Sequence, residues 1–345
     1  MRKKAACRFA AFIPQPRASW TVPLLLAGAL LGSQPLLAEW PQILGPERNG
    51  QVAEPLPTSF PAGGPRALWR YSVGEGMAGV AVAGGKALVF HRPGGVERLE
   101  ALDAKTGASL WRSDAPASYR GGILPDSGPR AVPTVHGDAA LVLGAGGLLR
   151  AHSLSDGAER WRVDLADTFA APEGYFGFGS SPLVLEAGER ALVIVPAGGD
   201  RSAVVAYDLA SGRLAWRAGE DRASYSSPIV ATLGGRRQVV ASTRMHTVGL
   251  EPGSGRELWR VPFGRRGPSV VAAVPVVAGG RLLLTAAYGV GGLLLDFSAA
   301  REPQSVWKGD QLSSHYPTPV VLGGHIYGAT GREDHGNGQL RALEL

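Results

Sequence analysis

The sequence predicts an all-β chain folded as a β-propeller, a ring of blades that each hold four short antiparallel strands. Three observations predict this fold. The 345 residues include 49 Gly and 26 Pro, with Val and Leu in short runs between Gly pairs, which is typical of strands joined by tight turns. A phrase that ends in Trp-Arg or Trp-Lys recurs along the chain, and a second phrase of the form x-Pro-x-Val recurs at a similar spacing.

The first 38 residues are interpreted as a secretory signal. Five basic residues and no acidic one accompany an apolar run from Trp20 to about Leu31, and we expect cleavage after Ala38. Five of the 35 basic residues lie in this segment, so the mature chain would carry 30 basic against 29 acidic residues, a net charge of +1. We therefore expect a periplasmic or secreted protein that binds no nucleic acid and has no transmembrane helix after cleavage. Cys7, the sole cysteine, would be removed, so we expect no disulfide, cysteine metal site or lipid anchor.

The Trp phrase is present in four copies that align without gaps and in a fifth that is stretched. The fifth copy, Leu295 to Lys308, lacks the Gly of the other four. Consecutive tryptophans of the series are 42 to 55 residues apart, a period that suits four strands and their turns. The four aligned copies are LDAKTGASLWR (102–112), HSLSDGAERWR (152–162), YDLASGRLAWR (207–217) and LEPGSGRELWR (250–260), and the tryptophans expected to dock are Trp69, Trp111, Trp161, Trp216, Trp259 and Trp307.

One complete unit, Ser180 to Ala218, shows how each repeat divides. It contains the apolar runs PLVL, ALVIV, AVVAYDL and LAWRA, separated by EAGER, AGGDRS and ASGR. Each separator holds a Gly that can adopt the positive φ of a tight turn. Four strands per unit, repeated about an axis, give a propeller whose blades must stack to bury their faces.

The Trp phrase has a structural explanation. In the first copy, Asp103 and Thr106 can accept hydrogen bonds from turn amides, and Gly107 supplies the left-handed corner. Trp111 would project from the outermost strand against a neighbouring blade. We therefore assign these residues to packing and turn formation.

The phrase resembles the tryptophan-docking motif of the pyrroloquinoline-quinone (PQQ)-like propeller repeat, from about Trp69 onward. EWPQILGPERNG, Glu39 to Gly50, narrows the resemblance to exported PQQ-like propeller proteins abundant in planctomycetes and related bacteria. Within this superfamily, quinoprotein alcohol dehydrogenases hold PQQ and calcium, whereas an outer-membrane assembly lipoprotein serves as a scaffold. With Asn49 and Asn337 as its only asparagines, the chain offers little of the dehydrogenases' Glu, Asn and Asp calcium set, so we expect no cofactor and no metal.

Two short motifs are better explained by structure than by chemistry. GEGMAG, Gly74 to Gly79, fits a dinucleotide pattern, but a strand and a Gly-Gly turn follow it instead of a helix, so it is interpreted as the entry to the first blade. REDHGNG, Arg332 to Gly338, could suggest an oxygen-rich ion site, but it aligns with hairpin tips in other units and is interpreted as a solvated turn.

The candidate ligand surface lies on the loops that join each outer strand to the next inner strand. In propellers these loops gather at one mouth of the axis, where Tyr and Arg side chains suit sugars, peptides or acidic groups. The alternative is that the rings plug the channel and the arginines are solvated. The candidate residues are Tyr119, Arg120, Tyr175, Tyr225, Arg265, Arg266, His315 and Tyr316.

We therefore divide the chain into a signal peptide (1–38), an N-terminal extension (39–64) and a propeller (65–345) with six visible blades. The last residues, GNGQLRALEL, stop inside the repeat, so we expect a truncated chain whose complete form has seven or eight blades. The alternative is closure of six blades by Arg66 to Tyr71 pairing with Gln339 to Leu345. The predicted function is a non-catalytic binding or scaffolding module for an envelope protein, a polysaccharide or a peptide; the alternative is a periplasmic PQQ-dependent dehydrogenase with calcium.

Overall fold

The computed structural model describes residues 39–345, apart from 53–54, 56, 268, 299–301 and 333–334. The described residues belong to the unit Leu37–Leu345. The predicted signal segment, 1–38, lies outside them, and so do Glu333 and Asp334 of the REDHGNG motif.

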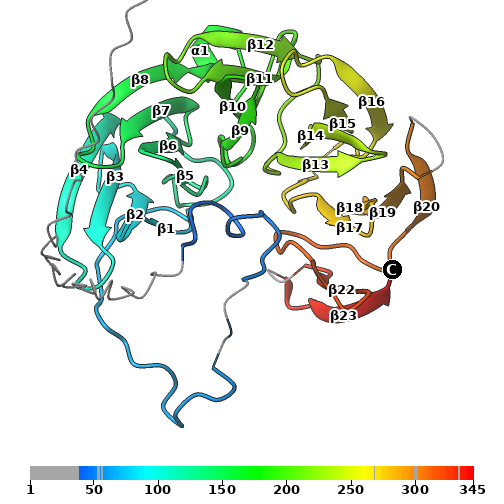
Figure 1. The fold of residues 1–345 in the computed structure, drawn as a ribbon, viewed down its shortest axis with the longest axis horizontal. Coiled ribbons are helices and arrows are strands. Elements are labelled where there is room, and N and C mark those ends of the chain that lie inside the picture. Colours follow the sequence, from blue (N-terminus) through cyan, green and yellow to red (C-terminus); the bar gives the residue numbers. More distant parts are fainter. Residues whose placement is uncertain (1–38, 53–54, 56, 268, 299–301, 333–334) are drawn as a thin grey trace, which may run out of the picture. The chain divides into compact units, whose positions relative to one another are not determined.

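The described chain forms antiparallel sheets whose strands are consecutive in sequence, as the repeat predicts (Figure 1). Five sheets have four strands and the sixth has three. The first two sheets are β1 (Ala81–Ala83), β2 (Lys86–His91), β3 (Val96–Asp103) and β4 (Ser109–Pro116), then β5 (Thr134–His136), β6 (Ala139–Leu143), β7 (Leu148–Ser153) and β8 (Glu159–Asp164). The third and fourth are β9 (Leu183–Ala187), β10 (Arg190–Gly199), β11 (Ser202–Asp208) and β12 (Leu214–Ala218), then β13 (Ile229–Leu233), β14 (Arg236–Ser242), β15 (His246–Leu250) and β16 (Glu257–Pro262). The last two are β17 (Val276–Ala278), β18 (Arg281–Ala286), β19 (Gly291–Asp296) and β20 (Gln304–Gly309), then β21 (Val320–Leu322), β22 (His325–Thr330) and β23 (Gln339–Glu344).

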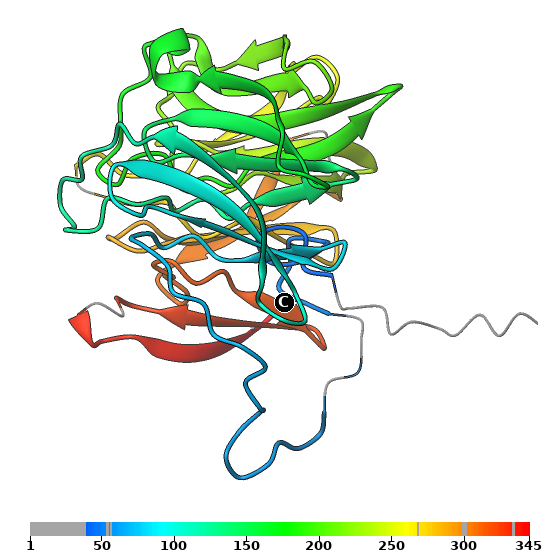
Figure 2. The same ribbon diagram turned by 90° about the vertical axis from the view of Figure 1, so that its left-hand side faces the viewer.

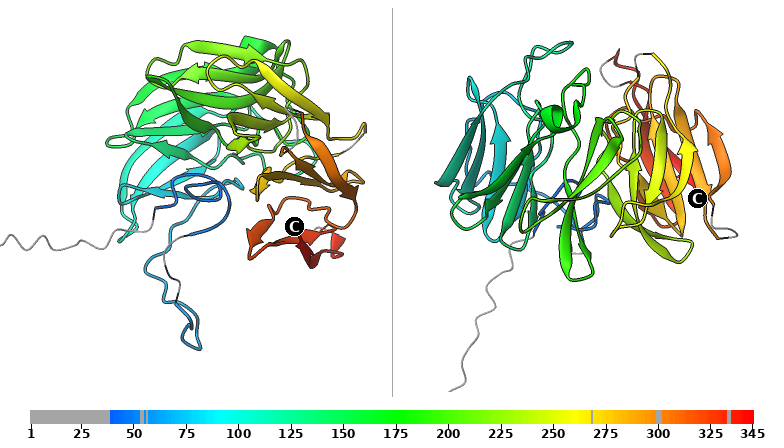
Figure 3. Two further views of the ribbon diagram at one scale, coloured as in Figure 1. Left: turned by 45° about the vertical axis from the view of Figure 1, so that its right-hand side comes forward. Right: turned by 90° about the horizontal axis from the view of Figure 1, so that it is seen from above.

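The sheets are blades of a β-propeller, with β1, β5, β9, β13 and β17 innermost (Figures 1 and 3). Each hydrophobic cluster lies between two neighbouring blades; for example, Val193 and Val205 of the third blade pack with Leu141 and Leu149 of the second. Because every blade buries its faces against the next one, the stack forms a continuous core. The fold class predicted from the repeats is confirmed.

Four tryptophans dock on the glycine turn of the following blade, as the Trp phrase predicts. The ring of Trp111 covers Gly157, whose φ is +77°, and its Nε1 donates to the carbonyl oxygen of Leu154 at 3.0 Å. A Cβ at Gly157 would lie 2.5 Å from the Trp111 ring, so the ring requires glycine there. The same contact joins Trp69 to Gly107, Trp161 to Gly212 and Trp216 to Gly255.

The last two tryptophans are placed differently, and for Trp259 the reason is that the stretched repeat it would dock on lacks the turn glycine. Trp259 packs against Phe297 with ring centroids 5.2 Å apart, and its Nε1 donates to the side-chain oxygen of Gln238. Trp307 packs against the cluster that joins the last two blades, beside Leu283 and Ile326.

The segment from Glu39 to Gln51 connects the inner strands of several blades. Trp40 pairs with Val82 of the first blade, and the carbonyl of Pro41 accepts from the amide of Val135 in the second. At its far end the side chain of Gln51 donates to the carbonyl of Val321 in the last blade at 2.6 Å. The segment predicted to be a simple extension therefore bridges blades that are remote in sequence.

Arg48 anchors this segment and is 4% exposed. Its guanidinium donates to the carbonyl of Pro228 at 2.7 Å and also reaches the carbonyls of Ser181 and Pro182, at the starts of β13 and β9. Its Nε donates to the side chain of Gln42 at 2.8 Å. Burial lowers the pKa of Arg48 to about 9, which leaves the guanidinium charged at neutral pH.

β23 pairs with β22 alone among the described strands, and most of its side chains are exposed. Arg66 to Tyr71 forms no strand, and no described hydrogen bond joins it to Gln339–Leu345. The alternative of closure by this pairing is therefore not observed, although Trp69 docks on Gly107 as an outer-strand tryptophan would. The neighbouring exposed residues 57–66 project away from the sheets in Figure 2.

Candidate functional site

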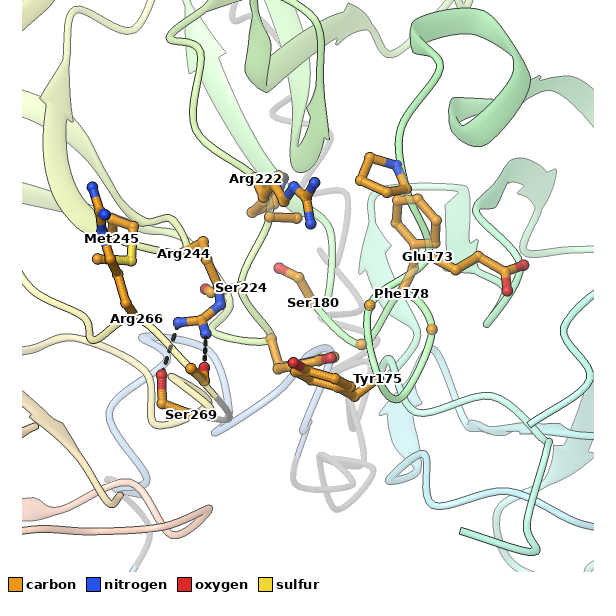
Figure 4. Close-up of a pocket in the computed structure, with 18 residues that line it drawn as sticks. Glu173, Tyr175, Phe178, Ser180, Arg222, Ser224, Arg244, Met245, Arg266 and Ser269 are labelled. Atoms are coloured by element: carbon orange, nitrogen blue, oxygen red, sulfur yellow. Dashed lines mark hydrogen bonds between the residues drawn. The ribbon is translucent and has the colours of Figure 1, made fainter. Parts of the chain in front are cut away.

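The candidate site is a cavity of about 450 Å³ at one mouth of the propeller, formed by the loops of the second, third and fourth blades (Figure 4). Connections that enter the inner strands reach this mouth, and so do the hairpins between the second and third strands of each blade. Both kinds of loop line the cavity: 172–180 leads into β9, 222–225 leads into β13, and Arg244 and Met245 form the β14–β15 turn. A short helix, α1 (Leu165–Phe169), precedes the first of these loops.

The described lining is positively charged because it contains three arginines and one glutamate. Arg222, Arg244 and Arg266 come from three different loops of the fourth blade and its neighbourhood, and Glu173 lies on the loop before β9. Arg222, Arg266 and Glu173 are exposed, and none of these three side chains has a hydrogen-bond or ion-pair partner among the described residues. The cavity therefore presents guanidinium groups that can still bind an anion.

Arg244 is held in place by the loop that carries Arg266. Its Nη1 donates to the carbonyl of Arg265 at 2.9 Å and to the hydroxyl of Ser269 at 2.8 Å, and its Nη2 donates to the carbonyl of Gly267 at 2.6 Å. Figure 4 shows this guanidinium between the loop and the cavity. Arg244 thus fixes the position of the loop while adding positive charge to the lining.

Tyrosines support the loop that leads into β9. The hydroxyl of Tyr119 donates to the carbonyl of Tyr175 at 3.0 Å, and the hydroxyl of Tyr225 accepts from the amide of Phe176 at 3.2 Å. Burial raises the pKa values of Tyr119 and Tyr225, so both phenols remain protonated at neutral pH. The ring of Tyr175 is 48% exposed and is available to a ligand.

The serine hydroxyls of the lining are bonded to the scaffold. Ser224 donates to the carbonyl of Ser242 at 2.6 Å, and Ser180 donates to the carbonyl of Ser226 at 3.0 Å. Their protons are directed at backbone oxygens instead of a general base, so these hydroxyls stiffen the floor of the cavity.

The structure divides the eight predicted site residues into two groups. Tyr175, Tyr225 and Arg266 line the cavity, and Tyr119 supports it. The side chain of Arg265 points elsewhere, with Nη1 donating to the carbonyl of Tyr288 at 3.2 Å. Arg120 is exposed on the loop before β5 and does not line the cavity.

His315 and Tyr316 belong to a separate aromatic cluster on the last two blades. The Nε2 of His315 lies 3.0 Å from the hydroxyl of Tyr288, and the ring of Tyr316 lies over that of His315 with centroids 3.6 Å apart. The expectation that residues of five blades converge on one site is therefore met for the second to fourth blades only.

Sequence reasoning missed Arg222 and Arg244. Arg222 lies three residues before the predicted Tyr225, on the same loop into the fourth blade. Arg244 lies on the β14–β15 hairpin, whereas all eight predicted residues lie on connections between blades. The signal that could have found Arg244 is topological, because a four-stranded blade brings its second hairpin to the same mouth as its entry loop.

The lining does not fit a divalent cation. Calcium takes six to eight oxygen ligands, mostly carboxylates and carbonyls. Glu173 is the carboxylate of the described lining and shares it with three arginines. Elsewhere in the described residues, no group of three or more His, Cys, Asp or Glu side chains is arranged to hold a metal ion.

Comparison with known proteins identifies the family. A model of PQQ-type repeats, described as "Outer membrane protein assembly factor BamB", matches residues 95–345, well over half of the chain. The chain belongs to this family. No curated protein matches it.

The solved structures that resemble this chain include BamB and two alcohol-oxidising dehydrogenases. BamB from Moraxella catarrhalis is 18% identical over 79% of this chain and 84% of its own, with a TM-score of 0.43. A europium-containing methanol dehydrogenase is 14% identical over 77% of this chain and 68% of its own, with a TM-score of 0.48. A quinohemoprotein alcohol dehydrogenase from Pseudomonas putida HK5 is 20% identical over 73% of this chain and 42% of its own, with a TM-score of 0.42.

Within the part of the chain that the structure describes, there is no helix with the length and hydropathy needed to span a bilayer.

Proposed function

We propose that this propeller is an exported, non-catalytic binding module that holds an envelope protein at the mouth formed by its second, third and fourth blades. The observation that carries the proposal is the cavity at that mouth, in which Arg222 and Arg266 are exposed without a partner among the described residues. Guanidinium groups beside an exposed aromatic ring are typical of surfaces that recognise proteins.

The construction of the site supports binding. Hydrogen bonds donated by Arg244 and Tyr119 and accepted by Tyr225 fix the loops before any ligand arrives. Fixed loops reduce the entropy lost on association. The family description names an assembly factor of the outer membrane, which supports a protein as the partner and the cell envelope as the location.

Photo-crosslinking tests the proposal directly. Tyr175 is replaced by p-benzoylphenylalanine, an aromatic residue of similar shape, in the organism that encodes the protein. Leu214, 47% exposed on the outer strand β12, carries the same probe as a control. We expect a discrete envelope protein to be captured from position 175 and not from position 214; equal capture from both positions contradicts the proposal.

Reconstitution with PQQ and calcium tests the dehydrogenase alternative. We expect no cofactor absorbance on the purified protein and no dye-linked oxidation of alcohols, because the carboxylate and arginine side chains of the cavity do not form a calcium site. Turnover that depends on both PQQ and calcium would overturn the non-catalytic assignment.

A further inference from the structure

We infer that the cavity recognises carboxylate groups on an acidic peptide segment of its partner, with Arg222 and Arg266 as the binding residues and Arg244 as the positioning residue. The inference rests on the proposed function and adds the chemistry of the ligand. The partner segment would be extended, would carry Glu or Asp side chains, and would have an apolar residue beside them.

The charges of the lining select an anion. The described lining contains three arginines, Arg222, Arg244 and Arg266, and Glu173 is its sole acidic residue. Arg244 already donates three hydrogen bonds to the loop 265–269, whereas Arg222 and Arg266 are exposed and have no acceptor in the described chain. An arginine with a free guanidinium can bind a carboxylate through two parallel hydrogen bonds.

The spacing of the loops favours more than one carboxylate. Arg222 precedes β13 and Arg266 precedes β17, so the two guanidinium groups come from the entries to successive blades. Figure 4 shows the two arginine side chains apart from one another. A cavity of about 450 Å³ admits several side chains of a peptide but is larger than a single inorganic anion requires.

An exposed aromatic ring, Tyr175, lines the same cavity as the arginines, and an exposed isoleucine, Ile123, lies on the adjoining loop. Ile123 is 64% exposed and Tyr175 is 48% exposed, and their loops are in contact because the backbone at Gly122 lies against the carbonyl of Tyr175. Exposed apolar side chains beside a charged cavity are typical of a protein-binding surface. This arrangement favours a peptide over an anionic sugar, which would have no apolar residue for Ile123.

Fluorescence anisotropy with fluorescein-labelled hexaglutamate tests the ligand chemistry, with hexaglutamine as the neutral probe. We expect hexaglutamate to bind and hexaglutamine not to bind, and salt to weaken the binding. The Arg222→Gln, Arg266→Gln double variant should lose about tenfold or more in affinity. The Arg222→Lys, Arg266→Lys variant should lose less, since lysine keeps the charge without the guanidinium fork.

The matched control is Arg190→Gln, Arg236→Gln. It removes the same charge from exposed arginines on the β9–β10 and β13–β14 hairpins, which lie at the opposite ends of the inner strands. Equal loss in both Gln double variants, or no binding of hexaglutamate at all, would overturn the inference. Stronger competition by tri-galacturonate than by unlabelled hexaglutamate would overturn the choice of a peptide.

The crosslinking and binding experiments distinguish failure of the proposed function from failure of the acidic-peptide inference. If position 175 captures an envelope protein but hexaglutamate does not bind, the proposed function stands and the acidic-peptide inference is wrong. If position 175 captures nothing more than position 214 does, the proposed function is wrong, whatever hexaglutamate does.

Discussion

Replacing Arg48 by alanine should lower the free energy of unfolding by about 3 kcal/mol. The side chain is 4% exposed and donates to backbone carbonyls of Ser181, Pro182 and Pro228 on the third and fourth blades. A hydrogen bond from a charged donor contributes about 1.5–3 kcal/mol, so the summed contribution of the three bonds is larger than the predicted loss of stability. The alanine variant is spared the cost of desolvating the guanidinium. Water that reaches the three carbonyls also replaces part of the lost hydrogen-bond energy.

Two variants separate the hydrogen bonds from the charge. Arg48→Lys keeps the charge but offers one nitrogen to three carbonyls, so we expect a loss of about 1–2 kcal/mol. Arg190→Ala removes an exposed arginine and should change stability by less than about 0.5 kcal/mol.

Urea unfolding followed by tryptophan fluorescence measures these differences. The urea midpoint should be highest for Arg190→Ala, lower for Arg48→Lys and lowest for Arg48→Ala, and the slope of the transition should be the same for all three. A midpoint for Arg48→Ala that matches the wild type would refute the reasoning, because it would mean that Glu39–Gln51 does not hold the inner strands together.

Three further predictions concern the docking contacts, the buried histidine and the loop of the site. Gly157→Ala should lower the free energy of unfolding by about 2 kcal/mol more than Gly94→Ala does. Both glycines have φ near +78°, but a Cβ at Gly157 would meet the Trp111 ring, whereas a Cβ at Gly94 would meet nothing within 4 Å. Equal urea midpoints for the two variants would contradict the docking contact. Burial lowers the pKa of His152 to about 4, so the unfolded chain takes up a proton below pH 6.5 that the folded chain does not. Stability should therefore fall by about 3 kcal/mol from pH 6.5 to pH 4, and His152→Gln should flatten this slope in urea titrations. Tyr225→Phe removes the acceptor of the Phe176 amide and should speed its hydrogen exchange about tenfold, whereas Tyr207→Phe, which removes a buried hydroxyl without a partner, should not.

The fold was predictable from the sequence because the repeat carries its own turn chemistry. The phrase contains both the glycine of the turn and the tryptophan that packs on the turn of the next blade, as in the pairs Trp161–Gly212 and Trp216–Gly255. One copy of the phrase therefore predicts a blade. Where that pairing breaks, the prediction was less informative: Trp259 packs on Phe297 because the stretched repeat has no turn glycine.

Contacts remote in sequence were harder to predict. The short helix α1 depends instead on a local contact, Asp164 accepting from the amide of Asp167, which is a weak signal at the end of a strand. The role of Arg48 depends on three carbonyls more than 130 residues away, which no local pattern indicates. The structure gathers four of the eight predicted residues at one cavity and places His315 and Tyr316 in a separate cluster, because loop sequences show which residues are near the mouth and not which blades share a cavity.

The affinity of the captured envelope protein tests the central claim most directly. Calorimetry would compare wild type, the Arg222→Gln, Arg266→Gln variant and the Arg190→Gln, Arg236→Gln variant. The account predicts that the first pair of substitutions weakens binding at least tenfold and that the second leaves it unchanged. Equal affinities for all three proteins would show that the partner is held at another surface of the propeller.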